Sequence, residues 1–244
     1  MRRLGLVVSL LVLWQLAALH GLPDYVLSPL DIGRNFITAL GTSELYVDAW
    51  ASLMRAIPGF VIGTVAGVAL GLAAGIWRSF DEMLSPLVFL SYPVPKIVML
   101  PVFMLWFGIG DLSKVLIIAL ACFYPSFINA FYGARATPRI LVWSARNMGA
   151  TQAQIFRRVV LPGALPLIFA GMRVSLALSF IVMFATEMIN ARSGLGYLIR
   201  QAENGLRFDL MYVALLTIAI LGYAGDRLLR FSREKLLPWE ASHA

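Results

Sequence analysis

The chain has 244 residues, of which 60% are hydrophobic and 14% are charged, with a formal net charge of +7 and a mean hydropathy of +0.81. A soluble domain is about 45–50% apolar and about 25% charged, so this composition excludes a water-soluble globule. The single cysteine excludes an internal disulfide, and two histidines are too few for a zinc site.

Uncharged apolar stretches recur along the chain, and several reach the roughly 20 residues that a helix needs to cross about 30 Å of hydrocarbon. We therefore predict an all-α integral membrane protein with six transmembrane helices. They are expected at residues 4–22, 56–77, 83–108, 115–132, 163–185 and 210–229. The first stretch, with its basic start, also fits a signal peptide, but it lacks a clean small-x-small cleavage site and is interpreted as a span.

Glycine recurs every four residues in the second predicted span. The residues are Gly59, Gly63, Gly67, Gly71 and Gly75. This spacing makes a smooth helix face that another helix backbone can approach closely. The helix that packs on this face belongs either to the same chain or to a second subunit. We favour a helix of the same chain.

Prolines interrupt the third predicted span at Pro93, Pro95 and Pro101. Each proline removes a backbone donor, so we expect a broken helix that faces protein or a wet cavity. Lys96 lies beside the break, and a charge within a span usually marks a pathway. It is a candidate for attracting an anionic substrate, with a side chain that snorkels to the interface as the alternative. Arg173, inside the fifth span, is expected to pair with a carboxylate or a carbonyl end in a structural role.

The basic residues indicate the orientation. Six spans place both termini on one side, where about twice as many Lys and Arg are expected as on the other, so the positive-inside rule predicts cytoplasmic termini. Residues 1–49 then hold the first transmembrane helix and an outer connection, 50–235 the main transmembrane domain, and 236–244 a cytoplasmic tail. Because this basic surplus lies near anionic headgroups, the net charge requires no nucleic acid partner.

The loop over residues 133–162 is cytoplasmic in this topology and carries helix signals. Thr137 followed by Pro138 predicts an N-cap with proline at the first helical position. The helix is expected to run to Met148, with Gly149 as the left-handed residue that ends it.

A second helix signal follows within the same loop. Thr151 and Gln154 form a predicted capping box, which starts a short helix ending before Pro162. The loop is therefore expected to be a bent pair of helices under the membrane. The residues leave two roles open, a docking site for a partner and an interfacial helix that rests on headgroups.

Polar residues also follow the fifth span, on the predicted outer side. Glu187 ends this span, and Gly194 and Gly196 would let the next segment turn sharply. We expect a gate or vestibule floor here, with a salt bridge from Glu187 to Arg192 or Arg200 as the alternative. The candidate pathway or gate residues are Pro93, Pro95, Lys96, Glu187, Gly194 and Gly196.

The cytoplasmic loop also resembles a family signature. Ser144-Ala145-Arg146-Asn147-Met148-Gly149-Ala150, followed by Val159-Val160-Leu161-Pro162, is similar to the signature of binding-protein-dependent ABC importer permeases, Glu-Ala-Ala, three residues, Gly, nine residues and Ile-x-Leu-Pro. The spacing fits without a gap. Trp143 stands where the signature has Glu, and Val159 stands where it has Ile.

The resemblance extends over residues 50–235. Four ordered blocks look like the nitrate, sulfonate and taurine importer branch: Pro93-Val94-Pro95-Lys96, the residues 105–110, the residues 156–166 and the residues 193–197. The resemblance implies a multi-pass inner-membrane permease that is paired in the membrane, that docks ATP-binding ABC subunits, and that receives a small anionic substrate from an extracytoplasmic binding protein. It assigns coupling to Ser144, Ala145, Arg146, Gly149, Ala150, Thr151, Leu161 and Pro162.

The chain lacks the motifs of an ATPase. Its three lysines follow Pro, Ser and Glu, so the Gly-Lys-Ser/Thr end of a P-loop is absent, and no Gly-x-Ser-x-Gly elbow occurs. We expect no cofactor or metal in this chain, with ATP and Mg²⁺ on a separate ATPase subunit.

Three alternatives remain beside the importer permease. The first, an integral-membrane transferase, needs clustered catalytic groups, yet Asp81-Glu82 is the one adjacent acidic pair and has no further acids or histidines nearby. A stand-alone channel or carrier would leave the docking loop without a purpose. A permease of the same family for a non-anionic substrate also stays open.

Overall fold

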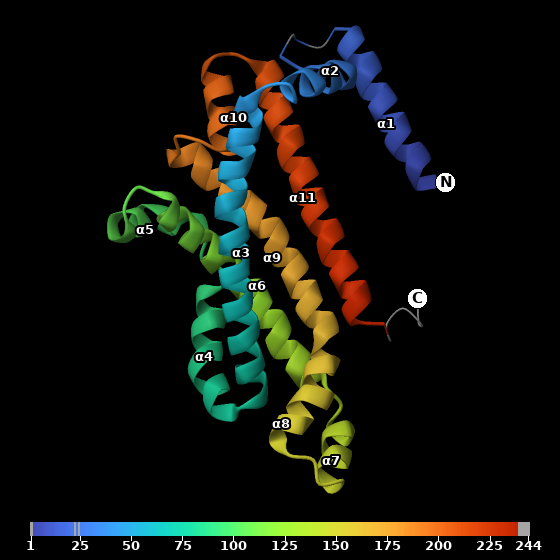
Figure 1. Ribbon diagram of the computed structural model, residues 1–244, viewed down its shortest axis with the longest axis vertical. Coiled ribbons are helices and arrows are strands. Elements are labelled where there is room, and N and C mark those ends of the chain that lie inside the picture. The colour runs from blue at the N-terminus through green and yellow to red at the C-terminus, as the bar shows by residue number, and fades with distance from the viewer. Residues whose placement is uncertain (1, 22, 24, 239–244) are drawn as a thin grey trace. The chain divides into compact units, whose positions relative to one another are not determined.

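The computed structural model describes residues 2–21, 23 and 25–238, and every regular element in them is helical (Figure 1). The chain divides into two compact units. One comprises Met1–Leu53 and Phe184–Leu221, and the other comprises Met54–Met183 and Gly222–Ala244. The predicted all-α fold class is therefore confirmed.

The first unit holds α1 (Arg2–Leu19), α2 (Pro29–Ala39) and α10 (Leu195–Asn204). It also holds residues 43–53 of α3 (Ser43–Ile76), residues 184–190 of α9 (Leu161–Asn190) and residues 208–221 of α11 (Phe208–Leu236). The connection expected after the first helix, within residues 1–49, is largely helical, because it holds α2 and the start of α3, whose first 13 residues (Ser43 to Arg55) precede the span expected from residue 56. Leu45, buried in one cluster with Leu195, Leu198 and Val213, stabilises this early part of α3. Tertiary packing thus overrides a locally polar composition.

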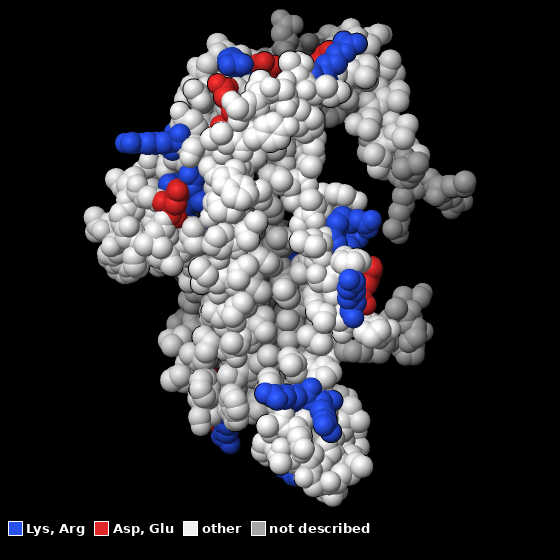
Figure 2. All heavy atoms as spheres, in the orientation of Figure 1, with Lys and Arg blue, Asp and Glu red and all other residues white. Residues whose placement is uncertain are grey.

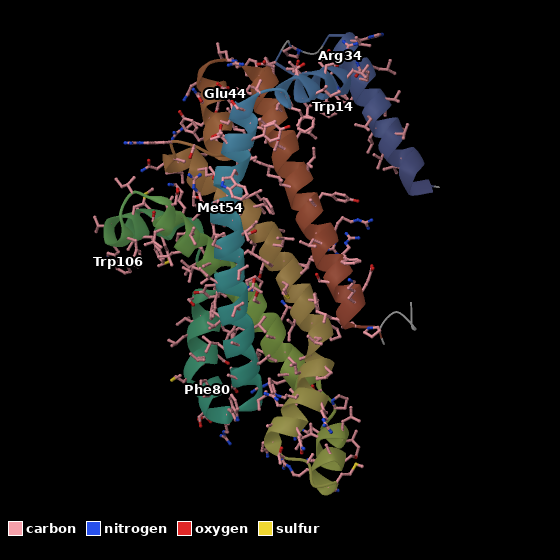
Figure 3. All side chains as sticks on the ribbon, in the orientation of Figure 1. Trp14, Arg34, Glu44, Met54, Phe80 and Trp106 are labelled. Carbon is pink, nitrogen blue, oxygen red and sulfur yellow. The ribbon has the colours of Figure 1, made fainter. Side chains whose placement is uncertain are left out.

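The second unit holds the remaining helices and the other parts of α3, α9 and α11. These are α4 (Arg78–Ser91), the 3₁₀ turn η1 (Lys96–Met99), α5 (Leu100–Phe107), α6 (Asp111–Ala136), α7 (Arg139–Asn147), α8 (Gln152–Ile155) and the π turn η2 (Phe156–Val160). α4 and the η1–α5 segment are bent by 94° at the proline break, which confirms the predicted interruption. Figure 3 shows Trp106 on α5, where its side chain is 68% exposed.

The glycine face of α3 packs against α6 within the second unit. A Cβ atom added at any of its five glycines would come within 3.0 Å of an atom of α6. At Gly67, for example, the nearest atom would be the backbone oxygen of Phe123, at 2.5 Å. The favoured interpretation of the glycine spacing, close packing inside one subunit, is confirmed.

Among the residues that the structure describes, four helices are long and apolar enough to cross a membrane. They are Ser43–Ile76, Asp111–Ala136, the continuous helix Gln152–Asn190 and Phe208–Leu236. The bent pair Arg78–Ser91 and Lys96–Phe107 is a fifth if it counts as one broken span, and Gly5–Leu19 is a shorter apolar helix. The six-span count and the cytoplasmic termini remain predictions, and residues 239–244 of the proposed tail lie outside the described residues.

The α3–α6 contact can be tested with one methyl group. Gly63→Ala adds a Cβ that meets the backbone of Ala119, and overpacking of this kind costs about 1–3 kcal/mol. Gly33→Ala is the matched control, because Gly33 is also helical and has no atom within 4 Å of the added Cβ. Thermal unfolding in detergent should show a lower midpoint for Gly63→Ala only. An unchanged midpoint for Gly63→Ala would contradict the close α3–α6 approach.

Candidate coupling loop and translocation segment

The loop between α6 and α9 is built around a small apolar core. Val142 and Ala145 of α7 pack against Ile155 and Val160, which are buried. α7 and α8 consequently lie side by side at one end of the second unit (Figure 1). Figure 2 shows that Lys and Arg atoms predominate over Asp and Glu atoms on the visible face of this end. The exposed arginines of this end are Arg139, Arg146, Arg157 and Arg158.

The end of α7 has the predicted glycine stop. Gly149 has φ +82°, its N–H donates to the oxygen of Arg146 (3.0 Å), and the N–H of Ala150 donates to the oxygen of Ala145 (3.0 Å). This pair of bonds is a Schellman motif, which satisfies carbonyls that a helix end otherwise leaves unpaired.

The start of α8 has the predicted capping box. The N–H of Gln154 donates to Thr151 Oγ1 (3.3 Å), and the N–H of Thr151 donates to Gln154 Oε1 (2.8 Å). Together with the Schellman motif, these bonds fix the bend between α7 and α8 without help from a partner.

Two details of the predicted loop were wrong. Pro138 is extended, with ψ 125°, so α7 begins at Arg139 and Thr137 is not its N-cap. The Thr137 hydroxyl is instead buried without a hydrogen-bond partner and lies beside Gly163. The second helix also does not end before Pro162. It continues through the π turn, in which the N–H of Leu161 donates to the oxygen of Phe156, into α9.

The π turn explains why Pro162 does not break this helix. Its five-residue hydrogen-bond spacing shifts the donor–acceptor register just before the proline, where one donor is missing.

Among the predicted coupling residues, four are exposed and the other four are partly buried. The exposed ones are Ser144, Arg146, Gly149 and Thr151, and the partly buried ones are Ala145, Ala150, Leu161 and Pro162.

Lys96 closes the break that Pro93 and Pro95 create. Its ammonium donates to the backbone oxygens of Ser91 (2.6 Å), Tyr92 (3.1 Å) and Val94 (2.7 Å). An ammonium has three donors, and here all three bind carbonyls at the end of α4 and in the turn that follows it. The same nitrogen lies 3.9 Å from the centroid of the Tyr124 ring, in cation–π contact. Its charge therefore stabilises an irregular backbone segment, because carbonyls without a hydrogen-bond partner are costly in hydrocarbon.

Glu187 lies in the first unit and is completely buried, with 0% of its surface exposed. Ser52 Oγ donates to its Oε2 (2.8 Å), and so does the backbone N–H of Gly196 (2.9 Å). Gly194, with φ +113°, passes so close that an added Cβ would lie 2.5 Å from the Glu187 carboxylate. Only glycine fits this backbone and this space.

The same cluster supplies partners for the start of α10. The N–H of Gly194 donates to Asp48 Oδ1 (2.7 Å), and the N–H of Leu195 donates to Ser52 Oγ (2.8 Å). With the Glu187 bond, three successive N–H groups at this helix end are paired, and acidic side chains suit its partial positive charge. The sequence reasoning missed Asp48 and Ser52. Their i, i+4 spacing on α3, which places both on one face, was the available signal.

Arg173 of α9 and Arg200 of α10 both bind groups of the chain itself. Arg200 donates to three backbone oxygens at the end of α9, at 2.9–3.1 Å. Arg173 pairs with Asp226 of α11 (Nε–Oδ1 2.7 Å), and Arg230 binds the other oxygen of the same carboxylate (2.6 Å). The expectation that Arg173 pairs with a carboxylate is confirmed.

Sequence comparisons identify relatives over almost the whole chain. The chain is 33% identical to the taurine transport system permease protein TauC of Escherichia coli strain K12, over 96% of this chain and 87% of the relative. It is 35% identical to the putative aliphatic sulfonates transport permease protein SsuC of the same organism, over 97% and 90%. It is 36% identical to the riboflavin transport system permease protein RibX of Chloroflexus aurantiacus, over 98% and 91%.

The fold and a family profile agree with these relatives. A solved structure of the MetNI methionine ABC transporter in inward-facing conformations matches with a TM-score of 0.63, covering 74% of this chain and 92% of that chain at 24% identity. Residues 59–237 match the family described as binding-protein-dependent transport system inner membrane component. The chain therefore belongs to this family and is an inner-membrane permease subunit of an ABC importer, a transport component that works with ATP-binding subunits and a substrate-binding protein.

Proposed function

We propose that two identical copies of this chain form the translocation path of an importer for a small anionic substrate of the sulfonate, taurine or nitrate class. The observation that carries the coupling part of the proposal is the α7–α8 loop. Its bend is fixed by two capping motifs, and four of the predicted coupling residues, Ser144, Arg146, Gly149 and Thr151, are exposed on it. A rigid, exposed loop of this kind suits docking of an ATP-binding subunit better than a flexible linker would.

The continuous helix Gln152–Asn190 supports a mechanical connection. It begins in the docking loop and carries Glu187 near its other end. ATP-driven closure of the ATP-binding subunits would move the loop as a rigid body, and α9 would carry this movement along its axis. ATP and Mg²⁺ are assigned to the ATP-binding subunits, because the sequence has no P-loop.

The break at Lys96 and the cluster at Glu187 are assigned to the pathway. Pro93, Pro95 and Lys96 interrupt a candidate span, and irregular backbone at membrane depth is tolerated only against protein or a wet cavity. Gly194 and Gly196 let the start of α10 pack onto Glu187, which would act as a latch for a gate. In this topology both termini are cytoplasmic and lipid surrounds the paired subunits.

The substrate class rests on the relatives. TauC and SsuC are named for taurine and aliphatic sulfonates, which are small sulfonates, and Lys96 supplies a cationic group in the third span. A second candidate function, import of a non-anionic substrate, is favoured by the relative named for riboflavin at 36% identity. A membrane transferase has no comparable support.

The coupling role predicts a severe effect of Gly149→Val. The φ of +82° disfavours a β-branched residue, although an added Cβ would have no atom within 4 Å in the chain. We expect the protein to insert and fold, but ATP-driven uptake should fall at least tenfold in proteoliposomes and ATP-binding subunits should co-purify poorly. Gly149→Asn is the control, because asparagine tolerates this backbone better and should retain more assembly. Wild-type uptake and co-purification for Gly149→Val would exclude this loop as the coupling element.

The anion assignment predicts the behaviour of Lys96 variants. Lys96→Met leaves carbonyls unpaired, each costing about 1–3 kcal/mol, and also removes the positive charge. We expect lower thermal stability, and uptake of taurine, ethanesulfonate or nitrate per folded complex that is at least tenfold lower, with basal ATP hydrolysis nearly intact. Lys96→Arg keeps the charge and should keep most uptake. If Lys96→Met lowers stability but leaves uptake per folded complex unchanged, Lys96 only caps the backbone.

A further inference from the structure

The outward face of α7 carries apolar side chains. Successive residues of a helix are separated by about 100°, so Ile140 and Trp143 lie opposite Val142 and Ala145, which pack into the loop's own core. Ile140 is 64% exposed and Trp143 is 55% exposed. α7 therefore has one apolar face that the chain covers and a second apolar surface that the described part of the chain leaves open.

Trp143 also occupies an informative place in the sequence. It is the position at which the permease signature has glutamate, one residue before Ser144. A glutamate that is buried in an interface must pair with a hydrogen-bond donor or a cation of the partner, whereas a tryptophan is stabilised by an apolar pocket. Large aromatic side chains are also among the commonest residues that dominate binding energy at protein interfaces.

The position of α7 argues against a lipid partner. Arg157 and Arg158 are exposed in the π turn, and the uncharged stretch of α9 begins directly after them, at Val159. α7 lies on the side of this turn away from α9, at the end of the second unit (Figure 1). Because charged residues separate α7 from the apolar part of α9, we expect the outward face of α7 to meet water or protein rather than hydrocarbon.

We propose that Ile140 and Trp143 form an apolar knob that inserts into an apolar groove on the ATP-binding subunit. This inference rests on the proposed docking role of the loop and specifies the chemistry of its partner. The groove that receives the knob must lack the basic or donor group that a signature glutamate would pair with. The knob thereby selects an ATP-binding subunit with an apolar groove and discriminates against one built for glutamate.

The binding test uses the complex purified from the native host through a tag on this chain, in which the ATP-binding subunit is identified by mass spectrometry through its P-loop. After dissociation, that subunit is titrated against variants of the permease in nanodiscs. Trp143→Glu should weaken binding at least tenfold, while Trp143→Phe should stay within about threefold of wild type because it keeps an apolar ring. Leu141→Glu is the matched control, since Leu141 is 52% exposed on α7 but lies outside the knob, and it should bind normally.

The outcomes separate this inference from the proposed function. If Gly149→Val weakens binding and Trp143→Glu does not, the loop docks but the knob is wrong. If neither variant weakens binding, the docking role of the loop fails as well. Equal weakening by Leu141→Glu and Trp143→Glu would also overturn the knob, because the effect would then come from added charge anywhere on α7.

A crosslinking experiment distinguishes protein from lipid directly. Benzoylphenylalanine is incorporated at position 143, and separately at position 141, in the full complex in native membranes. Illumination should link position 143 to the ATP-binding subunit, giving a product that mass spectrometry identifies, with far less product from position 141. Crosslinking of position 143 to phospholipid alone would overturn the proposal and would support a headgroup-resting helix.

Discussion

Hydrocarbon offers no hydrogen-bond partner to a backbone N–H or C=O group, and this constraint bears on the two irregular segments that adjoin the apolar helices. At the proline break, the Lys96 ammonium pairs three carbonyls. At the start of α10, side chains of Asp48, Ser52 and Glu187 pair three N–H groups. These four side chains thus each pair a backbone group, which makes them candidates for function and also requirements for folding.

The membrane environment also favours close packing between helices. Helices in a membrane gain little from hydrophobic association and rely on contact and on interhelical hydrogen bonds. α3 approaches α6 through its glycines, and α6 approaches α9 through Ser126 and Ser175, whose hydroxyls lie 2.8 Å apart. Because Ser175 also donates to the oxygen of Cys122 (2.8 Å), the α6–α9 contact is tied at a second point. The α7–α8 loop joins these two packed helices and therefore has a firm base.

The sequence predicted those features whose causes are local. The uncharged stretches located the main spans, the prolines located the 94° bend, and Gly149 and Thr151 located the two caps of the loop. Features that depend on distant residues were missed. Glu187 meets Ser52 across 135 positions of the chain, and no local pattern predicts such a partner. The helical start of α3 was missed for the same reason, since its apolar side is buried by α10 and α11.

Proline was the least reliable local signal. Pro93 and Pro95 break a helix as expected, yet Pro162 lies inside a continuous one because the π turn before it absorbs the missing donor. The hydrogen-bond register around a proline decides this difference, and composition does not reveal it.

The central claim is that the α7–α8 loop transmits the stroke of the ATP-binding subunits. It is tested most directly by the distance between the two loops of an assembled complex. Met148 is 87% exposed and Cys122 is buried, so spin labels attached to Met148→Cys in a Cys122→Ala background report this distance. Electron–electron double resonance should give a shorter distance in complexes trapped with ATP and vanadate than in nucleotide-free complexes. Identical distance distributions in the two states, from complexes that hydrolyse ATP and import substrate normally, would contradict the account.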